Sequence, residues 1–325
     1  MASSGEQHGE SFLTVLIALV ANVAIAIAKS VAALLTGSAS MTAEAAHSWA
    51  DAGNEIFLLI GARRARQAPD RAHPYGYGRD VYVWSLFAAV GLFTVGAVVS
   101  IMHGITELGS DEPSEDSLIA YVVIAVSFAL EAVSFLRSVR QLRGTAAAAD
   151  QDVLEHVLAT SDPTVRAVFF EDAAALLGLL LAAAGIALHQ VTGSAVWDAI
   201  GSIAVGVLLG VVAVLLIQLN RRFLIGQSPS PRVIAAVLAL LQEQDEVATV
   251  SYLHLEYVGP ARVFLVAAVD LTGDAPEHEL AARLTALARD VERNEHVVEA
   301  VLTLSEPGAA PLVPSADPQS TRLPR

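Results

Sequence analysis

The sequence contains no cysteine, and only 16% of its 325 residues are charged. Without thiols the chain has no disulfide and no thiolate metal site, so zinc or a related metal has to be held by His, Asp and Glu. Asp and Glu outnumber Lys and Arg by 34 to 19, which gives a net charge of -15. This acidic balance argues against nucleic acid as a partner, because nucleic acid requires a basic face.

Apolar residues make up 54% of the chain, and the mean hydropathy is +0.55. A soluble domain carries charge on roughly a quarter of its residues. The composition therefore predicts a polytopic α-helical protein whose main partner is the lipid bilayer. The start, MASSGEQHGE, has no basic region ahead of its apolar run, so we expect no cleavable signal peptide.

Six apolar stretches are long enough to cross a bilayer, which takes about 20 helical residues. They cover residues 11–35, 41–62, 81–105, 118–136, 164–188 and 198–219. Arginines follow the second, fourth and sixth stretches, whereas the loops after the first, third and fifth have no Lys or Arg. The positive-inside rule then places both termini in the cytoplasm, and we expect the protein in the cytoplasmic (inner) membrane.

The predicted domains are an N-terminal tail (1–10), a membrane domain (11–226), a cytoplasmic domain (227–306) and a disordered tail (307–325) rich in Pro, Ala and Ser. Within the membrane domain, residues 144–163 are predicted to form a short amphipathic helix or linker. Periodicity in the cytoplasmic domain predicts the order αββαβ. Its predicted helices are 233–241 and 277–293, and its predicted strands are 248–257, 263–271 and 297–304.

The second apolar stretch carries charged residues that a lipid-facing helix should not contain. His47 and Asp51 are four residues apart, so in a helix they share one face, about one 5.4 Å turn apart. A neutral imidazole and a carboxylate at this spacing can hold one divalent cation. Glu44 lies on nearly the same face, and Glu55 follows one turn after Asp51. Ionisable groups at this depth predict a functional site.

A second charged pair, Glu171 and Asp172, lies in the fifth stretch. If Asp172 faces His47 and Asp51 across a helix interface, three ligands converge, and Glu171 or water supplies a fourth. The alternative is that both carboxylates only cap the start of the helix. We prefer the metal site, because residues 164–170 already have a helical pattern and place the pair inside the helix.

Other polar residues have structural explanations at least as good as functional ones. Asp70 and His73, in the loop after the second stretch, are candidates for a second metal site, but two ligands on one loop favour a structural role. Lys29 is a natural counter-ion for one of the carboxylates. Asn22, Glu131 and Asp198 are expected mainly in pairs between helices.

Several motifs resemble those of the cation diffusion facilitators, the zinc-transporter family. They are Asn22 and Lys29 in the first stretch, TGSASM before His47 and Asp51, HPYGYGR after the second stretch, DAIGSIAVG in the sixth, and a Gly-Pro turn in the C-terminal domain. SDPT followed by VFFEDAAALLG is most similar to the branch that includes the mitochondrial zinc transporter.

The resemblance implies a homodimer of six-helix protomers with metallochaperone-like cytoplasmic domains. It also implies export of cytosolic Zn²⁺ in exchange for protons by alternating access, with no catalytic residue and no prosthetic group. His47 and Asp51 become the main ligands, and Glu44 and Glu55 take supporting or gating roles. The family's fifth-helix pattern is H-x-x-x-D, but Val168 stands four residues before Asp172, which leaves Glu171 as an irregular partner.

Three alternatives remain open at this point. An oxygen-rich ligand set favours harder ions such as Mn²⁺ or Fe²⁺, and Co²⁺ or Cd²⁺ are further candidates. A non-transporting scaffold or heteromer subunit with a degenerate site is the second alternative. The third is an intramembrane metalloenzyme, for which the sequence offers neither an additional catalytic base nor an H-E-x-x-H pattern.

Overall fold

The chain forms two compact units in a computed structural model that describes residues 4–109, 117–148 and 151–313. The first unit comprises residues 1–63 and 81–221, and the second comprises residues 64–80 and 222–325. The segment that links two membrane helices, residues 64–80, therefore groups with the C-terminal part of the chain.

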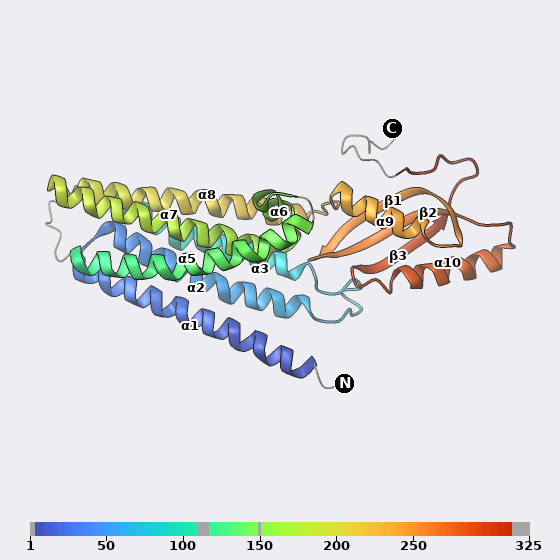
Figure 1. Cartoon of the computed structure of the whole chain (residues 1–325), viewed down its shortest axis with the longest axis horizontal. Helices are drawn as coiled ribbons and strands as arrows, with labels where there is room; N and C mark the ends of the chain where they lie inside the picture. The colour runs from blue at the N-terminus through green and yellow to red at the C-terminus, as the bar shows by residue number, and fades with distance from the viewer. Residues whose placement is uncertain (1–3, 110–116, 149–150, 314–325) are drawn as a thin grey trace. The chain divides into compact units, whose positions relative to one another are not determined.

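The first unit is a bundle of long helices (Figure 1). The helices are α1 (Ser4–Thr36), α2 (Ala39–Ala65), α3 (Asp80–Gly91), the π-helix η1 (Leu92–Val98), α4 (Val99–Glu107), α5 (Ser117–Ala148), the short α6 (Val153–Ala159), α7 (Pro163–Thr192) and α8 (Val196–Leu224). Because α3, η1 and α4 follow one another without a break, they form one span. Helix α1 begins within the segment 1–10 that the sequence predicts as a tail.

Within the described residues, five helices are long and apolar enough to cross a membrane. They are the part of α1 from Leu19 onward, the continuous helix 80–107, α5, α7 and α8. Helix α2 has 27 residues, which is long enough, but its many polar and charged residues make it too little apolar for that set. Together with α2 these helices give the predicted six-helix membrane domain, and the fold class is confirmed.

The connection between α5 and α7 differs in detail from the prediction. The fourth span was expected to end near residue 136, but α5 continues to Ala148. The extension includes Arg140, Arg143 and several alanines, which are good helix formers once water replaces lipid. The short helix expected in residues 144–163 is present as α6, and its Val157 is buried.

The second unit contains a three-stranded sheet with two helices in its described part. Its elements are α9 (Pro231–Gln242), β1 (Val247–Gly259), β2 (Arg262–Leu271), α10 (Glu277–Val291) and β3 (Val297–Leu304). The strand order is β1-β2-β3, with β1 antiparallel and β3 parallel to β2. This order of elements is the predicted αββαβ arrangement.

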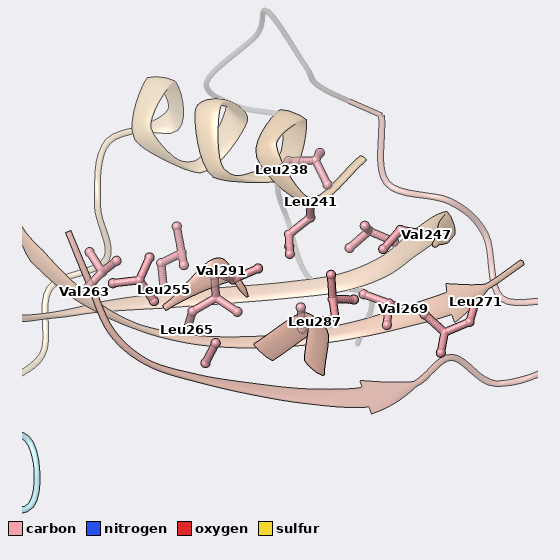
Figure 2. Packing of buried hydrophobic residues seen from close by; sticks show 14 residues of the cluster. Leu238, Leu241, Val247, Leu255, Val263, Leu265, Val269, Leu271, Leu287 and Val291 are labelled. Carbon is pink, nitrogen blue, oxygen red and sulfur yellow. The ribbon is translucent and has the colours of Figure 1, made fainter. Parts of the chain in front are cut away.

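One face of this sheet packs against both helices. In β2 every second residue, including Val263, Leu265 and Val269, is buried. Leu238 and Leu241 of α9 point toward the strands, and Figure 2 shows this contact. The alternation of buried and partly exposed residues is what a half-covered sheet requires.

The loop between α2 and α3 folds on the β1–β2 hairpin. The guanidinium of Arg79 forms an ion pair with Glu256, and the rings of Tyr75 and Phe264 lie 5.0 Å apart. A Cβ on Gly259 would lie 3.0 Å from the Cα of Gly78, so only glycine allows this backbone approach. These contacts explain why the loop groups with the C-terminal part of the chain.

Candidate metal site in the helix bundle

His47 and Asp51 lie on one face of α2, as their spacing predicts. The side chain of His47 is fully buried, and its Nδ1 lies 3.4 Å from Oδ1 of Asp51. Among the described residues, the two ring nitrogens of His47 have no hydrogen-bond partner, and Oδ1 of Asp51 has none either. Leaving such atoms unsatisfied costs about 1–3 kcal/mol for each group. A nitrogen and an oxygen left unpaired side by side fit the requirement for holding a cation.

Glu171 and Asp172 lie well inside α7. The N-cap of this helix is Asp162, whose carboxylate accepts a hydrogen bond of 2.8 Å from the amide of Thr164. Glu171 and Asp172 therefore do not cap the helix, and that alternative is excluded. Glu171 accepts a hydrogen bond from the side-chain amide of Asn54 in α2.

Asp172 turns to α5 and accepts a hydrogen bond of 3.0 Å from the hydroxyl of Ser134. Its neighbour Glu171 turns to α2, so the two adjacent carboxylates connect α7 to two different helices. This divergence follows from the roughly 100° rotation between successive residues of a helix.

A cavity of about 540 Å³ connects the two charged regions. Its lining includes Asp51 and Glu55 of α2 and both Glu171 and Asp172 of α7, and the remaining walls come from α1 and α5. The structure thus brings three of the four main candidates to one cavity. His47 is packed away from its surface, and the described residues contain no set of three or more His, Asp or Glu already gathered at ligand distance.

Glu44 has a different environment from the other candidates. Its Oε2 lies 2.9 Å from Nζ of Lys29 on α1, and both side chains are fully buried. Its carboxylate also lies against Gly178 of α7, where a Cβ would collide with it. The expectation that Lys29 neutralises one of the carboxylates is correct, and Glu44 is that carboxylate.

Two charged residues of α5 line the cavity, although the sequence did not place them at the metal site. Glu131 and Arg137 line it together with Ser134. Glu55 of α2, which also lines the cavity, accepts a hydrogen bond of 3.2 Å from Asn22. The available signal was the spacing of Glu131, Ser134 and Arg137, three residues apart along an otherwise apolar stretch, which places them on one helix face.

The loop candidates Asp70 and His73 form a compact turn. Oδ1 of Asp70 accepts hydrogen bonds from the amides of Ala72, at 2.8 Å, and His73, at 2.7 Å. The hydroxyl of Tyr77 donates to Oδ2 at 2.7 Å. These bonds, first that from Tyr77, lower the pKa of Asp70 to about 2, and the same contact raises the pKa of Tyr77. Both carboxylate oxygens are engaged, which favours the structural role.

The helix bundle of this chain matches a known family of membrane proteins. Residues 15–225 match the cation efflux transmembrane domain. The chain is similar to metal tolerance protein C4 of Arabidopsis thaliana, with 38% identity over 231 residues, 71% of this chain and 50% of that protein. It is also similar to a mitochondrial proton-coupled zinc antiporter of Homo sapiens, with 36% identity over 245 residues, 75% of this chain and 43% of that protein.

A third relative matches over a greater length. An uncharacterized transporter of Methanocaldococcus jannaschii is 24% identical over 294 residues, 88% of this chain and 94% of that protein. The chain spans about half the length of the plant and human relatives.

Proposed function

Because this chain belongs to the cation diffusion facilitator family, whose members are membrane cation transporters and not enzymes, we propose that it exports Zn²⁺ from the cytoplasm in exchange for protons. The observation that carries the proposal is the unpaired imidazole of His47 beside the unpaired oxygen of Asp51. Imidazole nitrogen with carboxylate oxygen is a common ligand set for zinc. The human relative is described as a proton-coupled zinc antiporter, which agrees with this choice of ion.

The proposed ligands are His47 and Asp51 of α2 with Glu171 and Asp172 of α7. Asp51, Glu171 and Asp172 already face the cavity, and Nδ1 of His47, 3.4 Å from Oδ1 of Asp51, would add the nitrogen. Glu44 is paired with Lys29, so we assign it a supporting role in α2, three residues before His47. Asp70 and His73 hold the α2–α3 loop.

Proton exchange follows from the chemistry of these ligands. Imidazole and carboxylate bind a metal only when deprotonated, so protons and the cation compete for the same atoms. A carboxylate-rich cavity that gains protons loses affinity for the cation. Protonation from the far side of the membrane would then release the ion and complete the exchange.

The orientation of the site agrees with export from the cytoplasm. The cavity lies toward the end of the bundle where α2 ends and α7 begins. Arg63 and Arg64 lie at that end of α2. They belong to the Arg-bearing loops that the positive-inside rule predicts to be cytoplasmic. We therefore propose an inward-facing cavity, cytoplasmic termini and a location in the cytoplasmic membrane.

A second ion class is favoured by one feature of the cavity. Five of its lining residues are carboxylates, namely Asp51, Glu55, Glu131, Glu171 and Asp172. Oxygen ligands suit harder ions such as Mn²⁺ and Fe²⁺. Co²⁺ and Cd²⁺ complete the set of ions to be compared with Zn²⁺.

We also propose that the protein is a homodimer. The face of the sheet turned away from α9 and α10 carries Tyr252 and Val301, which are 40% and 42% exposed. Tyr252 pairs with Ala268 and Val301 with Val266, so the two exposed side chains stand on the same face across β2. A second copy of the chain would cover this face.

The proposed function is tested by transport into everted vesicles. The double variant His47→Ala/Asp51→Ala is expected to reduce proton-driven Zn²⁺ uptake at least about 100-fold, because each lost ligand costs several kcal/mol. Asp70→Ala is the matched control, since it removes a carboxylate outside the bundle, and it should keep most of the uptake. Intact uptake in the double variant would refute the site.

Binding in detergent separates the transporter from a non-transporting scaffold. We expect the purified protein to bind Zn²⁺ and to lose it in Asp172→Ala. The same titration with Mn²⁺, Fe²⁺, Co²⁺ and Cd²⁺ gives the ion preference. A protein that binds none of them would be a scaffold or a heteromer subunit.

A further inference from the structure

The start of α2 is capped by a carboxylate from another helix. Oδ2 of Asp198, at the start of α8, accepts a hydrogen bond of 2.7 Å from the amide of Ala39. Oδ1 accepts bonds of 3.3 Å from the amide of Ser40 and 3.1 Å from the hydroxyl of Ser38. The first amides of a helix lack partners within it, and the positive end of its dipole attracts a carboxylate. Asp198 satisfies both requirements for α2.

The remaining donors of this turn are satisfied as well. The hydroxyl of Ser38 accepts a hydrogen bond of 3.1 Å from the amide of Met41. The hydroxyl of Ser40 donates to the main-chain oxygen of Asp198 at 2.8 Å. The same hydroxyl lies where a Cβ on Gly201 of α8 or Gly185 of α7 would collide with it. The first turn of α2 is therefore held by hydrogen bonds and by close packing.

Beyond this turn α2 is held by separate side-chain bonds, such as that from Lys29 to Glu44 and that from Asn54 to Glu171. From Ser48 onward one of its faces lines the cavity. The distance along the axis from Ala39 to His47 is roughly 12 Å, at 1.5 Å for each residue. At the cavity a movement of α2 relative to α7 would have to break only single bonds such as that from Asn54 to Glu171, whereas at the first turn it would have to break the whole set of bonds to Asp198.

We propose that Asp198 is a positioning residue for transport, because it fixes the start of α2 on α8 and confines the movement of the ligand-bearing helix to its other end. The proposal rests on cation transport by this chain and does not depend on which ion is carried. It concerns the rate of the transport step, since Asp198 is absent from the cavity lining.

The test is a kinetic comparison in proteoliposomes with the ion that the unaltered protein carries. Asp198→Ala removes both accepting oxygens, and we expect Vmax to fall at least roughly tenfold, because the loss of a single charged hydrogen bond already corresponds to about that factor. KM and the equilibrium affinity in detergent should stay within about threefold, because the cavity is unchanged. Asp198→Asn should lower Vmax by less than Asp198→Ala does, and Ser38→Ala should lower it by less than Asp198→Asn does.

Asp162→Ala is the matched control. Asp162 also accepts from a helix N-terminal amide, that of Thr164, but within its own helix. Its loss should leave Vmax within about twofold of the unaltered protein. If Asp198→Ala does not fold, Asp198→Asn and Ser38→Ala decide the question.

Two results would overturn the proposal. One is an unchanged Vmax in a folded Asp198 variant. The other is a fall in affinity as large as the fall in Vmax, because that pattern indicates general damage to the site. A protein that carries an ion other than Zn²⁺, or carries it without protons, would change the proposed function and leave this test valid.

Discussion

The first turn of α2 and the segment around His47 belong to one helix but differ in whether their polar atoms have hydrogen-bond partners. At the first turn, the amides of Ala39, Ser40 and Met41 all have acceptors outside the helix ladder. Around His47, both ring nitrogens and an oxygen of Asp51 have none among the described residues. Satisfied groups hold a helix in place, whereas buried groups left unsatisfied require an explanation, which the proposed metal site supplies.

Breaking a satisfied pair should have the largest effect on stability. Lys29→Met leaves the buried carboxylate of Glu44 without its cation, and we expect a loss of about 3–5 kcal/mol. Thermal unfolding of the purified protein measures the loss. The double variant Lys29→Met/Glu44→Gln removes both charges and should recover most of it. Equal unfolding temperatures in the single and double variants would contradict this explanation of the pair.

Removing an unsatisfied buried group should change the stability of the protein in the opposite direction. His47→Leu replaces two unpaired nitrogens by an apolar side chain, so the metal-free variant should be as stable as the original protein or up to about 2 kcal/mol more stable. The original protein should gain about 2.7 kcal/mol from Zn²⁺ at 100 times its dissociation constant, and the variant should gain much less. A less stable metal-free variant would indicate that His47 has a structural role.

The smallest effect concerns the satisfied carboxylate of the α2–α3 loop. Its pKa is lowered, so the stability that Asp70 gives to the turn is complete above its unfolded pKa of about 3.9 and is lost as the pH falls through about 2. Carbon-13 spectra of labelled aspartate should show the midpoint at the lower value. Tyr77→Phe removes the main cause and should move the midpoint upward, whereas a midpoint near 3.9 in the original protein would refute the assignment.

The sequence was sufficient for the features that depend on neighbouring residues. Long apolar stretches located the helices, alternation located the strands, and the four-residue spacing of His47 and Asp51 placed them on one face. The helical pattern before Glu171 was enough to reject a cap. The end of α5 was missed because a helix can continue past the apolar stretch into water.

The pairings between distant segments could not be predicted in the same way. By sequence alone Lys29 has several carboxylates of α2 as possible partners, whereas in the fold it pairs with Glu44, whose carboxylate packs against Gly178. Asp198 meets Ala39 from 159 positions away in the sequence. No periodicity within a single helix contains that information, because it depends on how the helices are arranged around one another.

The contact between the α2–α3 loop and the β1–β2 hairpin has a practical consequence for protein engineering. A shortened chain that ends after α8 would keep every membrane helix but would deprive Arg79 of Glu256 and Tyr75 of Phe264. Such a truncation would release the segment that directly follows α2. Anyone shortening this transporter for crystallisation should therefore keep the hairpin or redesign the loop with it.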